Sequence, residues 1–291
     1  MKRTEDSARL LLITLGCPKN VADSRQIAEA ISQRFPALKI RQNDDGGEYA
    51  VAIVNTCGFI RQARDHTRET IRKIIAARQL GRIRSVVIYG CMVEVAAAQL
   101  AEEFPEADRI IHLQNIQQII EHCASLIANG ETSDVSVSAM RPSIPPDPQY
   151  PHLAYLKIAE GCSRRCSYCT IPAIRGGFRS RSSDAIIQEA QQLAEAGVRE
   201  LLLVAQDLVN YGRDRSGERE LPGLLRKLHE IEGIHWIRLL YLHPIGLSDE
   251  LLSTMAELPK VCRYIDLPLQ HVSDRMLKVM RRGGSRQFLE Q

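Results

Sequence analysis

Three cysteines stand close together near the middle of the chain with CxxxCxxC spacing: Cys162, Cys166 and Cys169. They follow a run of strand-forming residues, 155–159. Thiolates are the usual ligands of iron–sulfur clusters, and three of them leave one iron of a four-iron cluster open to a substrate or cofactor. The spacing therefore favours an iron–sulfur centre whose open iron takes part in chemistry.

A structural zinc site is the alternative interpretation of this loop. Structural zinc takes four ligands, which commonly come from paired CxxC motifs or from a nearby histidine. In the sequence no fourth cysteine or histidine follows the loop closely. The iron–sulfur interpretation is favoured over zinc, and over three unligated thiols.

A second group of cysteines is spread over the first half of the chain, and each member follows a predicted strand: Cys17, Cys57 and Cys91. The carboxyl ends of parallel strands meet at one edge of a sheet, where ligands bind. A glycine flanks each cysteine and would let the backbone approach a bulky ligand. One such cysteine alone would be interpreted as a small buried apolar residue. Three with the same placement indicate a second metal centre.

Polar residues at the ends of later strands are further candidates. Gln206 and Asp207 follow strand 200–204 and could hydrogen-bond the amine or hydroxyls of a bound cofactor, although Asp207 could equally cap a helix or belong to a loop. His243 and His271 also follow predicted strands, but core or surface roles are favoured for both.

The remaining cysteines and a group of arginines have simpler interpretations. Cys123 and Cys262 are expected to pack in the core. The arginines near the cysteine loop are interpreted as solvated surface, or as a means of steering an anionic cofactor or a macromolecular substrate: Arg164, Arg165, Arg175, Arg179 and Arg181.

The pattern along the chain predicts an α/β protein in which an N-terminal open parallel sheet domain is followed by a partial (βα) barrel. Strands are expected at 10–15, 50–55, 85–89 and 109–113, and then at 155–159, 200–204, 235–240 and 264–267. Helices are expected at 22–34, 63–79, 93–103 and 116–128, and then at 184–196, 221–230, 249–258 and 274–281. The expected domains are 8–128 and 151–291, joined by a proline-rich linker at 129–150.

Composition limits the class of protein. The chain has 291 residues, 44% of them hydrophobic and 25% charged, with a net charge of +3. This is typical of a globular protein, and the charge neither supports nor excludes RNA binding. No apolar run approaches the length of about 18 residues that suggests a membrane span. Eight cysteines without a secretory signal predict a cytoplasmic protein with metal or redox chemistry rather than disulfides.

The CxxxCxxC motif, with Tyr168 directly before its last cysteine and a strand directly before the loop, resembles the radical S-adenosylmethionine (SAM) superfamily. Motifs around the strand-end cysteines narrow the resemblance to the methylthiotransferase family: Gly16-Cys17-Pro18-Lys19-Asn20, Asn55-Thr56-Cys57-Gly58-Phe59 and Tyr89-Gly90-Cys91. The resemblance extends roughly from Arg9 to Gln287.

Two branches of this family act on different substrates, tRNA adenosines or an aspartate of a small-subunit ribosomal protein. The tRNA branch commonly has Gln-Met after the first cysteine, whereas this chain has Pro18-Lys19-Asn20. Later segments are also similar to the ribosomal-protein branch: residues 169–176, Ala205-Gln206-Asp207 with Tyr211-Gly212, and residues 264–271. The resemblance therefore favours the aspartate substrate, with the tRNA substrate as the alternative.

The resemblance implies two 4Fe-4S clusters and SAM as cofactors. Cys162, Cys166 and Cys169 would hold the cluster whose open iron binds SAM, and a radical from SAM would abstract hydrogen from the aspartate β-carbon. The cluster on the strand-end cysteines Cys17, Cys57 and Cys91 would carry the sulfur to be inserted, and a second SAM would supply the methyl group.

The resemblance also implies binding residues and partners. Tyr168, Gln206 and Asp207 are expected to bind the cofactor, and no residue is assigned as catalytic. The expected partners are a small-subunit ribosomal protein, free or on the ribosome, and an electron donor such as flavodoxin or ferredoxin. No membrane partner is expected.

Two departures from the family pattern leave further alternatives open. Arg25 stands where the family commonly has glutamate. Compared with the family, the chain is expected to be C-terminally truncated, without the last barrel strands and the small β-domain called TRAM. The alternatives are a cluster-binding fragment without turnover and a zinc-stabilised RNA-binding module.

Overall fold

The structure is a computed structural model that describes residues 9–127 and 150–290. The chain forms two compact units, Met1–Ile144 and Pro145–Gln291. The predicted linker 129–150 lies outside the described residues except for Tyr150. Within the described part, no helix combines the length and the apolar character needed to cross a membrane.

The first unit is built on an open sheet of five parallel strands in the order β2-β1-β3-β4-β5. The strands are β1 (Arg9–Thr14), β2 (Lys39–Arg41), β3 (Tyr49–Thr56), β4 (Ile83–Gly90) and β5 (Arg109–Ile111). This confirms the predicted open parallel sheet. The sequence did not indicate β2, because its single apolar residue, Ile40, stands between two charged and exposed residues.

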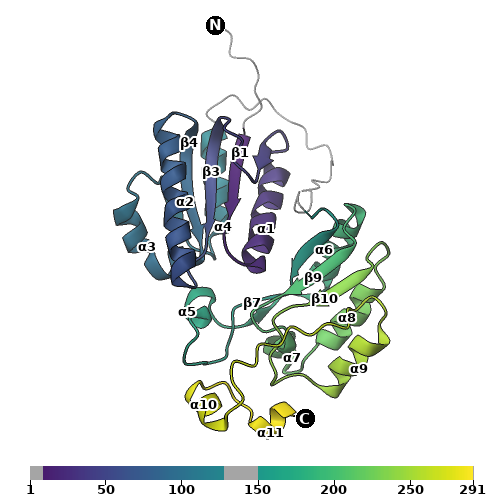
Figure 1. The fold of residues 1–291 in the computed structure, drawn as a ribbon. Coiled ribbons are helices and arrows are strands. Elements are labelled where there is room, and N and C mark those ends of the chain that lie inside the picture. The colour runs from purple at the N-terminus through teal and green to yellow at the C-terminus, as the bar shows by residue number, and fades with distance from the viewer. Residues whose placement is uncertain (1–8, 128–149, 291) are drawn as a thin grey trace. The chain divides into compact units, whose positions relative to one another are not determined.

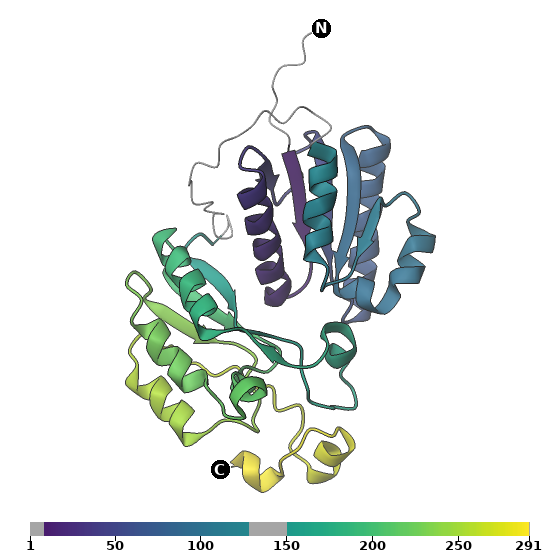
Figure 2. The ribbon, with the colours of Figure 1, turned by 180° about the vertical axis from the view of Figure 1, so that it is seen from behind.

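Helices cover both faces of this sheet, as Figures 1 and 2 show from opposite sides. Leu10 and Leu12 pack with α1 (Pro18–Arg34) and α4 (Ile116–Ile127). Leu11 belongs to the opposite core, with α2 (Arg61–Gln79) and α3 (Cys91–Glu103). Successive strand residues alternate between faces, so the central strands must be apolar throughout.

Helix α1 begins four residues before the predicted start. Cys17 stands at its N-cap position and Pro18 opens the helix, where the fixed φ of proline suits the first turn. The first turns bury polar residues instead of apolar ones, among them Lys19, Asn20 and Asp23. An apolar period was therefore not visible in this part of the sequence.

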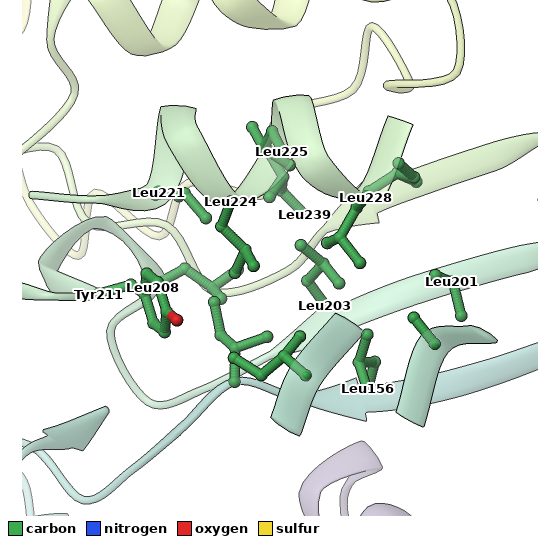
Figure 3. Close-up of a cluster of buried hydrophobic side chains, with 14 of the residues drawn as sticks. Leu156, Leu201, Leu203, Leu208, Tyr211, Leu221, Leu224, Leu225, Leu228 and Leu239 are labelled. Atoms are coloured by element: carbon green, nitrogen blue, oxygen red, sulfur yellow. The ribbon is translucent and has the colours of Figure 1, made fainter. Parts of the chain in front are cut away.

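The second unit is built on three parallel strands in the order β10-β9-β6. They are β6 (Leu153–Lys157), β9 (Glu200–Val204) and β10 (Trp236–Leu239). Helices α6 (Ser183–Glu195), α8 (Leu221–His229) and α9 (Asp249–Glu257) contribute to a leucine-rich core with these strands, part of which Figure 3 shows. The partial barrel predicted for this region agrees with this βα arrangement.

Short elements surround the ends of these strands and were not predicted, because pieces of two to five residues carry no period. Strands β7 (Ala159–Glu160) and β8 (Arg179–Ser180) pair antiparallel. The others are α5 (Ile171–Arg175), η1 (Leu208–Asn210), α7 (Arg213–Ser216) and α11 (Arg286–Glu290), whereas α10 (Asp274–Val279) corresponds to the helix predicted at 274–281.

The predicted strand 264–267 was wrong, because this segment forms no strand in the structure. It lies beside the segment after β10, where Leu242 N donates to Asp266 O at 3.0 Å. The Asp266 carboxylate accepts the Tyr241 N–H at 3.0 Å, so a side chain replaces backbone pairing there. Tyr241 has a φ of 64°, which takes the neighbouring chain out of the extended conformation that a ladder requires.

Gly90, at the end of β4, should be the less replaceable of two glycines with positive φ. An alanine Cβ there would lie 2.5 Å from Asn55 Oδ1 and 2.7 Å from Thr56 N, whereas the space around Gly81 is open. Gly81→Ala should cost about 1 kcal/mol for its left-handed backbone, and Gly90→Ala about 3 kcal/mol, because the clash adds to that strain. Hydrogen exchange of the β3 and β4 amides measures both changes, and equal losses would contradict the argument.

Candidate functional site

The strand-end cysteines lie on three loops of the first unit that touch one another. A Cβ on Gly16 would lie 2.7 Å from Cys57 Cβ and 2.8 Å from Cys57 Sγ. A Cβ on Gly58 would lie 2.9 Å from the carbonyl oxygen of Cys91. The structure thus brings the loops that carry Cys17, Cys57 and Cys91 to one edge of the sheet. These close approaches explain why glycines flank the cysteines.

The strand order indicates that this edge of the sheet is where a ligand would bind. In a sheet ordered β2-β1-β3-β4-β5, the connection after β1 leads to β2 on one side, and the connection after β3 leads to β4 on the other side. The order therefore reverses between β1 and β3, and ligands of such sheets bind at this switch point. Cys17 and Cys57 follow the two strands on either side of it, and Cys91 follows the next strand. Cys17 occupies the N-cap position of α1 and Cys91 begins α3, so two helix N-termini favour negative charge at this edge.

Asn20 ties the three cysteine loops together and was missed as a functional residue by the sequence analysis. Its Nδ2 donates to Leu15 O at 2.7 Å and to Thr56 O at 3.0 Å. The Cys91 thiol donates to Asn20 Oδ1 over 3.6 Å. A fully buried side chain therefore links the ends of β1, β3 and β4. Its place in the Cys-Pro-Lys-Asn motif was the only sequence signal.

One residue of a neighbouring helix also contacts a cysteine at this edge. Thr67 of α2 holds Cys57, since its Oγ1 donates to Cys57 O at 3.0 Å and accepts from Cys57 N at 3.3 Å. Arg25 is the residue that departs from the family pattern, and its Nη1 lies 4.0 Å from Glu29 Oε1, one turn further along α1.

The CxxxCxxC loop lies between β7 and α5 in the second unit. Cys162 N donates to Gly176 O at 3.0 Å, and Cys169 N donates to Cys166 O at 3.1 Å. Ser167 fixes the loop to the end of α10, with hydrogen bonds of 3.0 Å from its N to Met280 O and from its Oγ to Val279 O. Cys162 and Cys166 are buried and Cys169 is partly exposed. Burial raises the pKa of the Cys162 thiol.

Within residues 9–127 and 150–290, no three His, Cys, Asp or Glu side chains surround a point where one metal ion would sit. A single zinc ion needs four ligands about 2.0–2.3 Å from one point, whereas each thiolate of a four-iron cluster binds a different iron. Neither group of cysteines has the convergence that zinc requires. Their role as cluster ligands stays a prediction.

Glu160, directly before the cysteine loop, joins three elements through its carboxylate. It lies 3.1 Å from Lys157 Nζ and 3.0 Å from Arg175 Nη1, and it accepts a hydrogen bond from Gln206 Nε2 at 3.0 Å. Burial raises the pKa of this carboxyl, but the charges of Lys157 and Arg175 outweigh it and lower the pKa to about 2. Sequence analysis missed Glu160 because its partners are distributed over three segments.

Gln206 and Asp207 lie at the end of β9, and each keeps one buried polar atom without a partner. Asp207 Oδ2 accepts from Arg164 Nε at 2.5 Å and from Asn210 Nδ2 at 2.6 Å. Asp207 Oδ1 and Gln206 Oε1 have no partner among the described residues. An unpaired buried acceptor costs about 1–3 kcal/mol, so these atoms fit the amine or hydroxyl donors of a cofactor such as SAM. Asp207 stands before η1, but its side chain makes no capping hydrogen bond.

His243, for which a core or surface role was favoured, is buried near the same loop. Its Nδ1 accepts the Ile245 N–H at 3.1 Å, and its Nε2 has no partner in the part of the chain that the structure describes. Burial and then the charges of Arg164 and Arg282 lower its pKa to about 3. The ring is therefore neutral, and since Nδ1 accepts, Nε2 carries a hydrogen that it can donate to a ligand.

The remaining residues that the sequence singled out, a tyrosine, a histidine and two cysteines, differ in how deeply they are buried. Tyr168 is 46% exposed, and burial raises its pKa although Arg282 opposes the shift. His271 is exposed and its Nδ1 accepts from Ser273 N. Cys123 is buried in the core as predicted, and burial raises its pKa to about 12. Cys262 is only partly buried.

The arginines near the loop divide into two groups. Arg164, Arg175 and Arg181 form ion pairs, with Asp207, Glu160 and Glu189 respectively. Arg165 and Arg179 are exposed. The solvated-surface interpretation therefore holds only for the second group.

Each of the two units matches a different protein family. Residues 9–112 match a family described as uncharacterized protein family UPF0004, and residues 156–290 match the radical SAM superfamily. Radical SAM proteins use SAM and a 4Fe-4S cluster.

Curated relatives named "Ribosomal protein uS12 methylthiotransferase RimO" resemble nearly the whole chain. The relative from Geobacter sulfurreducens is 41% identical over 287 residues, which are 95% of this chain and 62% of the relative. The relative from Desulfitobacterium hafniense is 38% identical over 285 residues, again 95% and 62%. The chain thus spans about 62% of the length of these relatives.

Solved structures share the fold at low identity. The radical SAM methyltransferase TsrM from Kitasatospora setae has a TM-score of 0.63 and 14% identity, over 96% of this chain and 64% of its own. The cobalamin-dependent SAM radical enzyme OxsB has a TM-score of 0.62 and 11% identity, over 98% of this chain and 47% of its own.

Glu160→Gln should destabilise the second unit at pH 7 by about 3 kcal/mol, because the buried Arg175 and the partly buried Lys157 lose their shared carboxylate. A lowered carboxyl pKa stabilises the fold above the unfolded value of 4.5, and this contribution disappears as the pH falls toward 2. The difference between the parent chain and the variant should therefore shrink between pH 5 and pH 2.

Urea unfolding followed by fluorescence of Trp236, the single tryptophan, measures the difference in unfolding free energy between the two chains. Trp236 lies in β10, in the same unit as Glu160. The matched control is Glu257→Gln, which alters an exposed glutamate of α9. A pH-independent difference for Glu160→Gln would contradict the assignment.

Proposed function

We propose that this chain, which belongs to the radical SAM methylthiotransferase family, adds a methylthio group to the β-carbon of an aspartate in a small-subunit ribosomal protein. One observation carries the proposal. The chain has two groups of three cysteines: one follows three parallel strands of the first unit, and the other lies on a single loop after β6 and β7 in the second unit. It is also 38–41% identical, over about 95% of its length, to relatives named as uS12 methylthiotransferases.

In this proposal Cys162, Cys166 and Cys169 hold one four-iron cluster, and the strand-end cysteines Cys17, Cys57 and Cys91 hold a second. When bound, the first cluster and SAM supply the one-electron chemistry that can break an unactivated C–H bond, which no protein side chain provides. A second SAM would supply the methyl group.

The residues around the first cluster bind and orient the cofactor. Asp207 Oδ1 and Gln206 Oε1 would accept hydrogen bonds from bound SAM, and His243 Nε2 would donate one, because all three atoms are buried and unpaired among the described residues. Glu160 holds the Gln206 amide, and Arg164 joins the cysteine loop to Asp207 and to Ile245 O at 2.7 Å. Tyr168 lies at the exposed rim and is proposed to contact the cofactor there.

In the first unit, Asn20 keeps the three cysteine loops in place for the second cluster, which would carry the sulfur to be transferred. The N-termini of α1 and α3 favour the negative charge of thiolates. A small redox protein such as flavodoxin or ferredoxin would supply electrons. We propose a cytoplasmic location, since a ribosomal substrate and cysteines that bind clusters both require a reducing compartment.

Cysteine variants should separate the two clusters. After anaerobic reconstitution the chain should hold about eight irons, two clusters of four. Replacing Cys17, Cys57 and Cys91 by alanine should halve the iron and leave reductive SAM cleavage to deoxyadenosine intact, because the SAM-binding cluster remains.

Replacing Cys162, Cys166 and Cys169 should halve the iron and abolish deoxyadenosine. Cys123→Ala with Cys262→Ala is the control and should change neither measurement. Bound zinc with little iron would reject the cofactor assignment.

The substrate is tested in cells that lack the gene. Mass spectrometry should show that the methylthio group is lost from the aspartate of ribosomal protein uS12, and that the intact gene restores it while a Cys162→Ala copy does not. Loss from tRNA adenosine instead would replace the proposed substrate. No loss from either molecule would favour the cluster-binding fragment without turnover.

A further inference from the structure

Arg282 reaches the cysteine loop from the segment that follows α10. Its Nη1 donates to Cys166 Sγ over 3.8 Å, and its Nη2 donates to Pro268 O at 2.6 Å. The end of α10 just before this segment carries the two carbonyls that hold Ser167, those of Val279 and Met280. One guanidinium therefore bridges a predicted cluster ligand and the backbone of a different segment.

The charge of Arg282 has no carboxylate partner in the described part of the chain. Its side chain is partly buried, and its Nε is buried without a hydrogen-bond acceptor among those residues. A guanidinium stays protonated, and a cation withdrawn from water requires an anion nearby. The sulfur of Cys166 is the group in contact with it that becomes an anion when it binds metal.

The backbone before Arg282 adopts an unfavourable conformation that fixes its position. Arg281 has a φ of 50°, in the left-handed region where glycine usually ends a helix. Arg281 N donates to Lys278 O at 3.1 Å and Arg282 N to Leu277 O at 3.0 Å, which closes the end of α10. A non-glycine residue there costs about 1–2 kcal/mol, and strain of this kind collects at functional sites.

We propose that Arg282 raises the reduction potential of the cluster held by Cys162, Cys166 and Cys169, through a charge-assisted hydrogen bond to the Cys166 sulfur. The inference rests on the proposed function. Reduction takes one electron from the external redox protein and adds one negative charge to the cluster, while Arg282 keeps its proton. A fixed cation beside a ligand sulfur stabilises the reduced form more than the oxidised form, and hydrogen bonds to sulfur tune such potentials.

The test is a potentiometric titration monitored by electron paramagnetic resonance. A chain with Cys17, Cys57 and Cys91 replaced by alanine would carry only the cluster in question. In this chain Arg282→Gln should lower the reduction equilibrium constant at least tenfold, which is 59 mV for one electron. Arg282→Lys keeps the charge but loses the bridge between Cys166 and Pro268, so it should lower the constant by about two- to tenfold.

The matched control is Arg275→Gln, which removes one exposed positive charge from α10, the helix that precedes Arg282, and should leave the potential unchanged. A potential for Arg282→Gln equal to that of the control would overturn the inference while leaving the proposed function intact. If Arg282→Gln does not load a cluster, Arg282→Lys decides, and equality with the control would again overturn it. If the background chain itself forms no four-iron cluster, the proposed function fails instead.

Discussion

Parallel alignment of strands is the constraint on which both units depend. In the first unit Thr14, Asn55 and Tyr89 stand in register on β1, β3 and β4, so the residues that follow them emerge at one level. In the second unit β6, β9 and β10 bring the segments that follow them to one edge in the same way. Side chains that are far apart in sequence become neighbours because every strand points in the same direction.

Two kinds of buried polar group matter for the two candidate sites. Those that hold the shape are paired: Asn20 spans three strand ends, and Glu160 is shared by two cations and an amide. Those that face the predicted cofactor keep open atoms, as at Asp207, Gln206 and His243. The difference has a physical meaning, since an unpaired buried atom is tolerated where a ligand pairs with it.

Most of the fold and the positions of the cysteines could be predicted because they depend on local signals. The central strands β3 and β4 are long apolar runs, and both groups of cysteines follow strands. The contacts of Glu160 and Arg282 could not be predicted, because Arg282 is 116 residues from Cys166 and Glu160 is 46 from Gln206. The strand predicted at 264–267 failed for a similar reason, since the conformation of Tyr241 disrupts the pairing.

Charge around the cysteine loop is balanced at most places. Lys157 and Arg175 share Glu160, and Arg164 pairs with Asp207, so these cations add little net field at the cysteine sulfurs. Arg282 differs, because its contacts are a neutral carbonyl and the Cys166 sulfur. No neighbouring carboxylate among the described residues cancels the positive field of Arg282. Such a field changes the energy of a nearby group most when the charge of that group itself changes. At this edge of the sheet the group with that property is the metal centre that the three cysteines are predicted to hold.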